Sequence, residues 1–106
     1  MKTIMYVSHP YSGNEDGNVT KTENLVRELT AKYPDVIFLS PVLAFDCLRD
    51  QISYDEAMVS CITLLKRCDS IVLCGNWRDS KGCNVERLYA LGMGLKSFEY
   101  QGEGII

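Results

Sequence analysis

The sequence is short of the residues that build metal centres and disulfide frameworks. It has a single histidine, His9, and its five cysteines form no CxxC pair and no Cys/His cluster. An odd number of cysteines without paired spacing indicates reduced thiols and argues against structural zinc. We therefore expect free thiols, no metal or other cofactor, and a cytoplasmic location.

Positive charge and long apolar runs are also scarce. The 11 basic and 14 acidic side chains give a net charge of −3, which argues against a nucleic-acid-binding surface. No apolar run approaches the roughly 20 residues that cross a bilayer. Met1–Val7 runs directly into a strand pattern rather than into a signal peptide. Nucleic acid and membrane are therefore not expected as partners.

What the sequence does contain is alternating strand and helix patterns in 106 residues, enough for one domain spanning residues 1–106. Strands are predicted at Thr3–Ser8, Val36–Leu39, Ser70–Cys74 and Leu95–Tyr100. This alternation predicts an α/β fold: an open parallel sheet of four to five strands with helices on both faces, as in flavodoxin-like and Rossmann-like proteins.

Capping signals locate the predicted helices. Thr20-x-x-Glu23 resembles a capping box for a helix that ends before Pro34, and Tyr11–Asn18 before it reads as a polar loop. Ser53-x-x-Glu56 predicts the start of a second helix, and the preceding segment Pro41–Ile52 is expected to be irregular. A third helical pattern runs from Val85 to about Gly94.

The segment from Asp79 to Glu86 is the strongest functional signal. It joins the buried strand Ser70–Cys74 to the third helix, and ligands of open α/β sheets bind at the carboxyl ends of strands. Ser80 is either a helix N-cap or a hydrogen-bonding partner for a phosphate or hydroxyl. Glu86 is either a solvated charge, which spacing alone favours, or a nucleophile for a sugar carbon. Gly82 either relieves crowding or lets a ligand approach the backbone.

The other candidate residues also have ordinary structural interpretations. Tyr6 alternates with core residues, so by default we interpret it as a half-buried aromatic, and His9 as a structural or solvent-facing side chain. Trp77 is either a packing anchor or a surface on which a base stacks. Three aspartates are expected to be caps or solvated side chains: Asp46, Asp50 and Asp55.

Two motifs resemble the nucleoside 2-deoxyribosyltransferase superfamily, which includes deoxynucleoside-monophosphate N-glycosidases and small uncharacterised members. The first is Tyr6-Val7-Ser8-His9-Pro10-Tyr11-Ser12-Gly13. The second is Cys68-Asp69-Ser70-Ile71-Val72, followed by Ser80-x-Gly82-x-x-x-Glu86 and Ala90-x-Gly92. The order of strands and helices also fits, so the resemblance extends over most of the chain.

The resemblance implies cleavage or transfer at the N-glycosidic bond of a nucleoside or nucleoside 5′-monophosphate. Glu86 would attack the anomeric carbon, and Tyr6 would hold its carboxylate. It also implies that the following residues bind the substrate: Ser8, His9, Pro10, Gly13, Ser80 and Gly82. We add Trp77 as a surface on which the base could stack. The resemblance further implies a homo-oligomer built from dimers, in line with apolar side chains such as Leu43, Phe45 and Leu48 that a small domain leaves uncovered.

Two other functions remain open from the sequence. Family enzymes carry an aspartate in the helix before the third strand, where this chain has Cys61 and Leu65. Its loss favours a module that binds a nucleotide without cleaving it. A third possibility is a Toll/interleukin-receptor-like domain that splits NAD with a glutamate on a helix.

Overall fold

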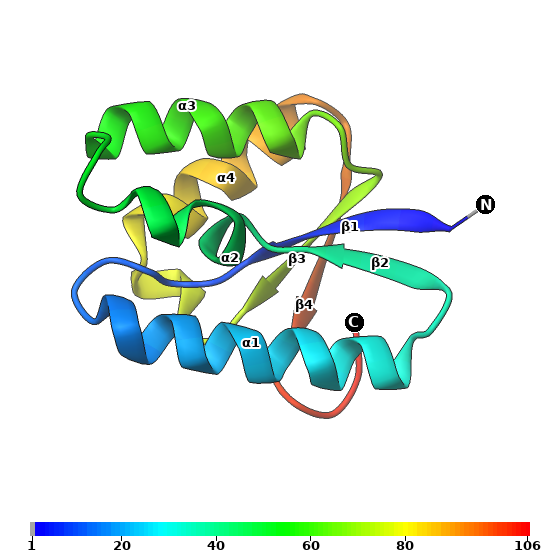
Figure 1. Ribbon diagram of the computed structural model, residues 1–106. Helices are drawn as coiled ribbons and strands as arrows, with labels where there is room; N and C mark the ends of the chain where they lie inside the picture. Colours follow the sequence, from blue (N-terminus) through cyan, green and yellow to red (C-terminus); the bar gives the residue numbers. More distant parts are fainter. Residues whose placement is uncertain (1) are drawn as a thin grey trace.

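The computed structural model describes residues 2–106 and contains one four-stranded sheet, in the order β2-β1-β3-β4 (Figure 1). The strands are β1 (Thr3–Ser8), β2 (Val36–Leu39), β3 (Ser70–Cys74) and β4 (Lys96–Tyr100). All three neighbouring pairs are parallel. The predicted parallel α/β fold is therefore confirmed, and β4 begins one residue later than expected.

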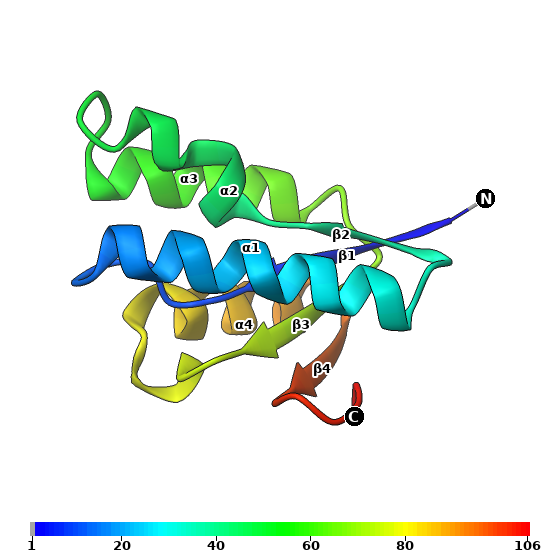
Figure 2. The same cartoon turned by 60° about the horizontal axis from the view of Figure 1, so that its bottom comes forward.

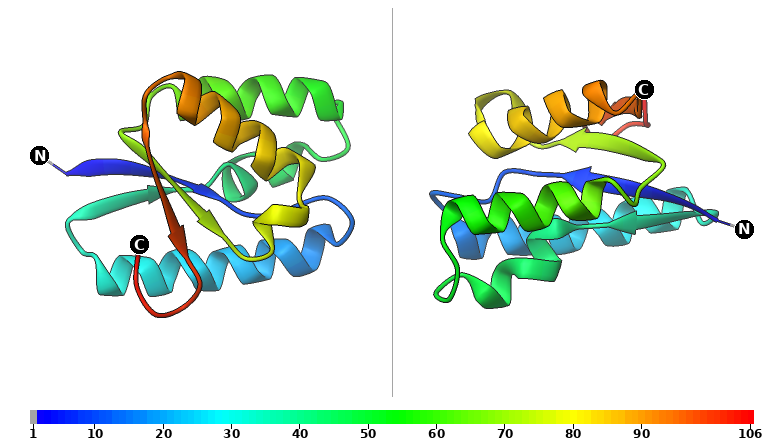
Figure 3. Two further views of the ribbon diagram at one scale, coloured as in Figure 1. Left: turned by 180° about the vertical axis from the view of Figure 1, so that it is seen from behind. Right: turned by 90° about the horizontal axis from the view of Figure 1, so that it is seen from above.

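Helices cover both faces of the sheet, because alternate side chains of each strand point to opposite faces. Helix α1 (Glu15–Lys32) lies on one face, while α3 (Tyr54–Leu65) and α4 (Lys81–Gly92) lie on the other (Figures 1 and 3). On the first face Leu29 packs with Val7 and Val72. On the second face Leu65 and Ala90 pack with other residues of β1 and β3.

The two central strands, β1 and β3, lead to opposite faces of the sheet. β1 continues into α1, whereas β3 continues through η2 (Trp77–Asp79) into α4, and both strands point the same way (Figure 2). Neighbouring parallel strands whose connections diverge leave a crevice at their carboxyl ends, which is where α/β proteins bind ligands.

Helix α1 begins earlier than the sequence analysis predicts. The structure has helix from Glu15, so the predicted polar loop Tyr11–Asn18 is too long and Thr20 is not a cap. Instead the Thr20 hydroxyl donates to the carbonyl of Asp16 within the helix. The first turns carry almost no apolar residues and so show no helical periodicity, yet Glu15 and Asp16 suit the positive end of a helix dipole.

The segment expected to be irregular is largely helical. It forms α2 (Pro41–Phe45) and the 3-10 helix η1 (Asp46–Leu48). Ser40 caps α2 by accepting a hydrogen bond from the Leu43 N–H at 3.1 Å, and Pro41 occupies the first turn, where its missing N–H costs nothing. Elements this short are too brief for the periodicity of apolar residues to reveal them.

The start of α3 agrees with the sequence, whereas α4 begins at Lys81, four residues before the predicted Val85. Ser53 and Glu56 form the predicted capping box at the start of α3. In α4 the buried residues are Cys83, Glu86 and Ala90, whereas Leu88 is 60% exposed and Tyr89 is 52% exposed. Two of the apolar residues that suggested this helix therefore face outward, and a carboxylate lies on its inner face. Among residues 2–106, no helix is long and apolar enough to span a bilayer.

Candidate active site

Glu86 is a buried carboxylate, not a solvated surface charge. It is 5% exposed, and two hydroxyl groups from β1 donate to it. The Tyr6 hydroxyl donates to Oε2, and the Ser8 hydroxyl donates to Oε1 at 2.7 Å. Tyr6 and Ser8 are two residues apart on a strand, so both side chains point to the α4 face. Each carboxylate oxygen is thus held by one donor.

The pKa of the Glu86 carboxyl group depends on two opposing effects, burial and hydrogen bonding. Burial raises the pKa of Glu86, and the hydrogen bonds from Tyr6 and Ser8 lower it. Burial and the neighbouring carboxylate raise the pKa of Tyr6, so its hydroxyl stays a proton-bearing donor. The site therefore holds a desolvated carboxylate in a fixed orientation.

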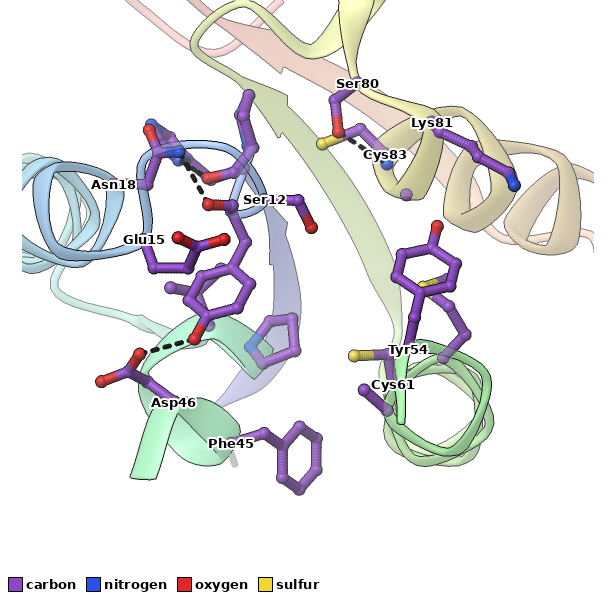
Figure 4. Close-up of a pocket in the computed structure, with 18 of the residues that line it drawn as sticks. Ser12, Glu15, Asn18, Phe45, Asp46, Tyr54, Cys61, Ser80, Lys81 and Cys83 are labelled. Carbon is purple, nitrogen blue, oxygen red and sulfur yellow. Dashed lines mark hydrogen bonds between the residues drawn. The ribbon is translucent and has the colours of Figure 1, made fainter. Parts of the chain in front are cut away.

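Glu86 lies in the wall of a cavity of about 1120 Å³ at the carboxyl ends of the strands. The β1–α1 loop, α2 with η1, the start of α3 and the segment from Gly75 to Cys83 enclose it. In Figure 4, Tyr54 and Cys61 of α3 face Phe45 and Asp46 across this space, and Ser80 lies at the start of α4. A cavity of this size accommodates a small organic ligand the size of a nucleotide.

Five of the nine residues predicted for the site line this cavity: His9, Pro10, Ser80, Gly82 and Glu86. Tyr6 and Ser8 are fully buried and do not line the cavity. They contact Glu86 on the side away from the cavity, so Ser8 orients the carboxylate instead of forming part of the wall. Gly13 is an exposed loop residue with φ 95°, outside the cavity wall. Ser80 also caps α4, accepting from the Cys83 N–H at 3.2 Å.

Trp77 packs beside the cavity rather than in its wall. It is 8% exposed, and its indole N–H donates to Glu99 at 3.0 Å. The Arg78 guanidinium covers the ring at 4.6 Å from the centroid. These contacts match the packing-anchor reading of Trp77, and its face is not free for a base to stack on.

His9 is held between the ends of β1 and β3. Its Nδ1 is 2.8 Å from the Pro10 carbonyl oxygen, and its Nε2 would be 2.9 Å from a Cβ on Gly75, whose φ is 61°. Gly75 is therefore required both for its backbone conformation and for the space the imidazole fills. Burial lowers the pKa of His9, so the imidazole is neutral at neutral pH.

Sequence reasoning missed a second polar cluster in the cavity, opposite α3. Asp46 accepts hydrogen bonds from Tyr11 at 2.7 Å and from Arg49 at 2.7 Å, and Arg49 also pairs with Asp16 at 2.8 Å. Asp16, Asp46 and Arg49 come from helical segments that were not predicted, so nothing in the pattern showed which way they point. Elsewhere, each of the five cysteines has a free thiol, and residues 2–106 contain no cluster of metal-ligating side chains.

Comparison with known proteins supports the fold. A chain described as "2-desoxiribosyltransferase from Leishmania mexicana" superposes with a TM-score of 0.66 over 95% of this chain, at 18% sequence identity. At that identity the likeness shows a shared fold, and this chain spans 65% of the length of that one. No curated protein matches the sequence. A family model does match residues 3–98, and the chain therefore belongs to the family described as a domain of unknown function, DUF4406.

Proposed function

We propose that this protein cleaves or transfers the N-glycosidic bond of a nucleoside or nucleoside 5′-monophosphate, with Glu86 as the nucleophile. The observation that carries the proposal is a buried carboxylate, oriented by two hydroxyl groups, in the wall of a cavity at the carboxyl ends of β1 and β3. A purely structural glutamate has no need of such a cavity. The shared fold with a chain named as a 2-desoxiribosyltransferase supports the same reaction class.

The geometry suggests how the reaction proceeds. As the bond from C1′ to the base stretches, positive charge develops on the sugar, and the Glu86 carboxylate is placed to stabilise it and to bond to C1′. Tyr6 and Ser8 keep one lone pair of the carboxylate directed at the sugar. Water or a second base then attacks C1′ and releases Glu86. Which of these acceptors is used decides between hydrolase and transferase.

The test is incubation with a panel of nucleosides, 2′-deoxynucleosides, their 5′-monophosphates and NAD, with free base measured by chromatography. Release of base from a nucleoside or monophosphate is the expected result. Release from NAD, but not from nicotinamide riboside or its 5′-monophosphate, would favour the NAD-splitting alternative. If no substrate loses its base but one binds, the nucleotide-binding module is the better description.

A 5′-phosphate is proposed to bind at the start of α4, beside Ser80 and Lys81. The first turn of α4 lines the cavity there, and the free N–H groups and dipole of a helix N-terminus favour an anion. Ser80→Ala should therefore weaken binding of a monophosphate more than binding of its nucleoside, by roughly fivefold or more in relative Kd, measured by calorimetry. The matched control is Ser40→Ala, which removes the cap of α2 outside the cavity wall. Equal losses for both ligands would leave Ser80 as a cap only.

The chain is also proposed to form a homo-oligomer built from dimers. Large apolar side chains are exposed on the outer surfaces of α3 and α4, among them Val59 (67%), Leu88 (60%) and Leu91 (67%). A second copy of the chain would cover them. Light scattering at micromolar concentration should give at least a dimer, and Leu88→Glu should shift it toward monomer. Ile37→Glu changes an exposed apolar residue on the edge strand β2 and should not. A monomeric wild type would contradict this assembly.

A further inference from the structure

The cavity provides a nucleophile but no good proton donor beside it at neutral pH. A neutral base needs a proton as it leaves the sugar, and a side chain usually supplies it. The titratable groups around Glu86 are Tyr6 on β1, Tyr54 and Cys61 on α3, and Cys83 on α4. Tyr6 is committed to Glu86. On α3, the cavity wall is otherwise made of Ala57 and Met58, which have no proton to give.

The pKa shifts of these groups also make them poor proton donors. Burial raises the pKa of the Cys61 thiol to about 11, and it also raises the pKa values of Cys83 and Tyr54. Weak acids of this kind protonate a leaving base poorly at neutral pH. His9 has the opposite shift and carries no spare proton there.

Besides Glu86, four carboxyl groups line the cavity; three of them are engaged as acceptors, and the fourth, Asp50, belongs to an exposed residue. Asp46 accepts from Tyr11 and Arg49, and those hydrogen bonds lower its pKa. Glu15 accepts from the Gly13 N–H, and its pKa is lowered by backbone hydrogen bonds. Asp79 accepts from the Asn76 amide at 2.9 Å. The charged residues of the wall are five acids and three bases: Glu15, Asp46, Asp50, Asp79, Glu86, Lys21, Arg49 and Lys81. The wall is therefore net negative.

From this arrangement we infer that the substrate is an N-glycoside whose base carries a positive charge, such as a pyridinium or N-alkylated purine nucleoside or its 5′-monophosphate. The inference rests on the proposed function and names its substrate class. A cationic base suits a cavity wall with more carboxylates than cations, because unlike charges attract most strongly where water is partly excluded. It also needs no proton to depart.

The reaction then balances without an acid. A bond forms between a Glu86 oxygen and C1′ while the bond from C1′ to the ring nitrogen breaks. The electron pair of that bond goes to the nitrogen, and the cationic ring becomes a neutral molecule. Water then bonds to C1′, the ester bond breaks to restore the carboxylate, and one proton is released to solvent.

The test compares 7-methylguanosine with guanosine, two nucleosides that differ by one methyl group and a positive charge. The assay is run at a mildly acidic pH at which the methylated ring keeps its charge. We expect kcat/KM for 7-methylguanosine to exceed that for guanosine by about a hundredfold or more, the size of a missing general acid. Glu86→Gln, assayed in parallel, gives the background for each nucleoside.

The binding of the same pair to Glu86→Gln gives a readout without catalysis. We expect 7-methylguanosine to bind more tightly than guanosine, with a difference that shrinks as salt is added. Guanosine cleaved within about tenfold of 7-methylguanosine would overturn the substrate class and leave the proposed function standing. Equal binding of the pair would also overturn it. Failure of both nucleosides, together with the whole substrate panel, would overturn the proposed function itself.

Discussion

Glu86→Gln should abolish most base release, by roughly a thousandfold or more, while the protein still folds. The amide has nearly the shape of the carboxylate but is a very poor nucleophile and carries no charge to stabilise the sugar cation. Stability should be kept, because the substitution replaces a desolvated charge with a neutral group that can still accept a hydrogen bond. Chromatography of free base measures the first effect, and thermal unfolding measures the second.

The matched control for that variant is Glu99→Gln. Glu99 is a carboxylate on β4 that accepts from the Trp77 indole and from Arg78, outside the cavity wall. Base release by this variant should stay near the wild-type rate. A Glu86→Gln protein that releases base as fast as the wild type would remove Glu86 from the mechanism.

Removing the hydroxyl groups that hold Glu86 should move the pH profile in a defined direction. Attack needs the ionised carboxylate, so kcat/KM rises as pH passes upward through the pKa of Glu86. The hydrogen bonds from Tyr6 and Ser8 lower that pKa against the opposing effect of burial. Tyr6→Phe and Ser8→Ala should each raise it, and the rising limb should shift to higher pH, further for Tyr6→Phe.

The same two variants should lose rate at neutral pH, by about ten- to a hundredfold for Tyr6→Phe, the value of a hydrogen bond to a charged group. Tyr100→Phe is the control, because Tyr100 is also a buried tyrosine whose hydroxyl donates to a carboxylate, that of Glu28, away from this cavity. Its pH profile should match the wild type. An unshifted limb in Tyr6→Phe would mean that the group titrating in the profile is not Glu86.

The central strands and the location of the site were predictable because their signals are local and strong. Ser70–Cys74 is a short apolar run, and every one of its residues is buried between helices. Ser53 and Ser80 were recognisable as helix starts because capping depends on residues three positions apart. Because β1 and β3 are parallel neighbours, Tyr6 and the segment before Glu86 could be expected near each other at the carboxyl ends of these strands.

The parts that sequence reasoning missed depend on orientation across long separations. Glu86 shares the buried face of α4 with the small residues Cys83 and Ala90, whereas the large apolar residues Leu88 and Leu91 are exposed, so the apolar pattern did not mark the inner face clearly. Ser8 and Glu86 are 78 positions apart, and only the packing of β1 against α4 shows that Ser8 donates to the carboxylate. Trp77 looked available for a base, but its indole N–H had a partner on β4 that a local motif cannot reveal.

A covalent intermediate on Glu86 separates this proposal from a module that only binds a nucleotide, and it can be trapped. A nucleoside with fluorine at the 2′ position destabilises the cationic transition states and slows breakdown of a glycosyl-enzyme. After incubation with a reactive 2′-fluoro nucleoside and rapid acid denaturation, intact-mass analysis should show one added fluorosugar per chain. Fragmentation of the labelled peptide should place it on Glu86, and Glu86→Gln should remain unlabelled. Base release with the label on another residue would contradict the assignment of Glu86 as the nucleophile.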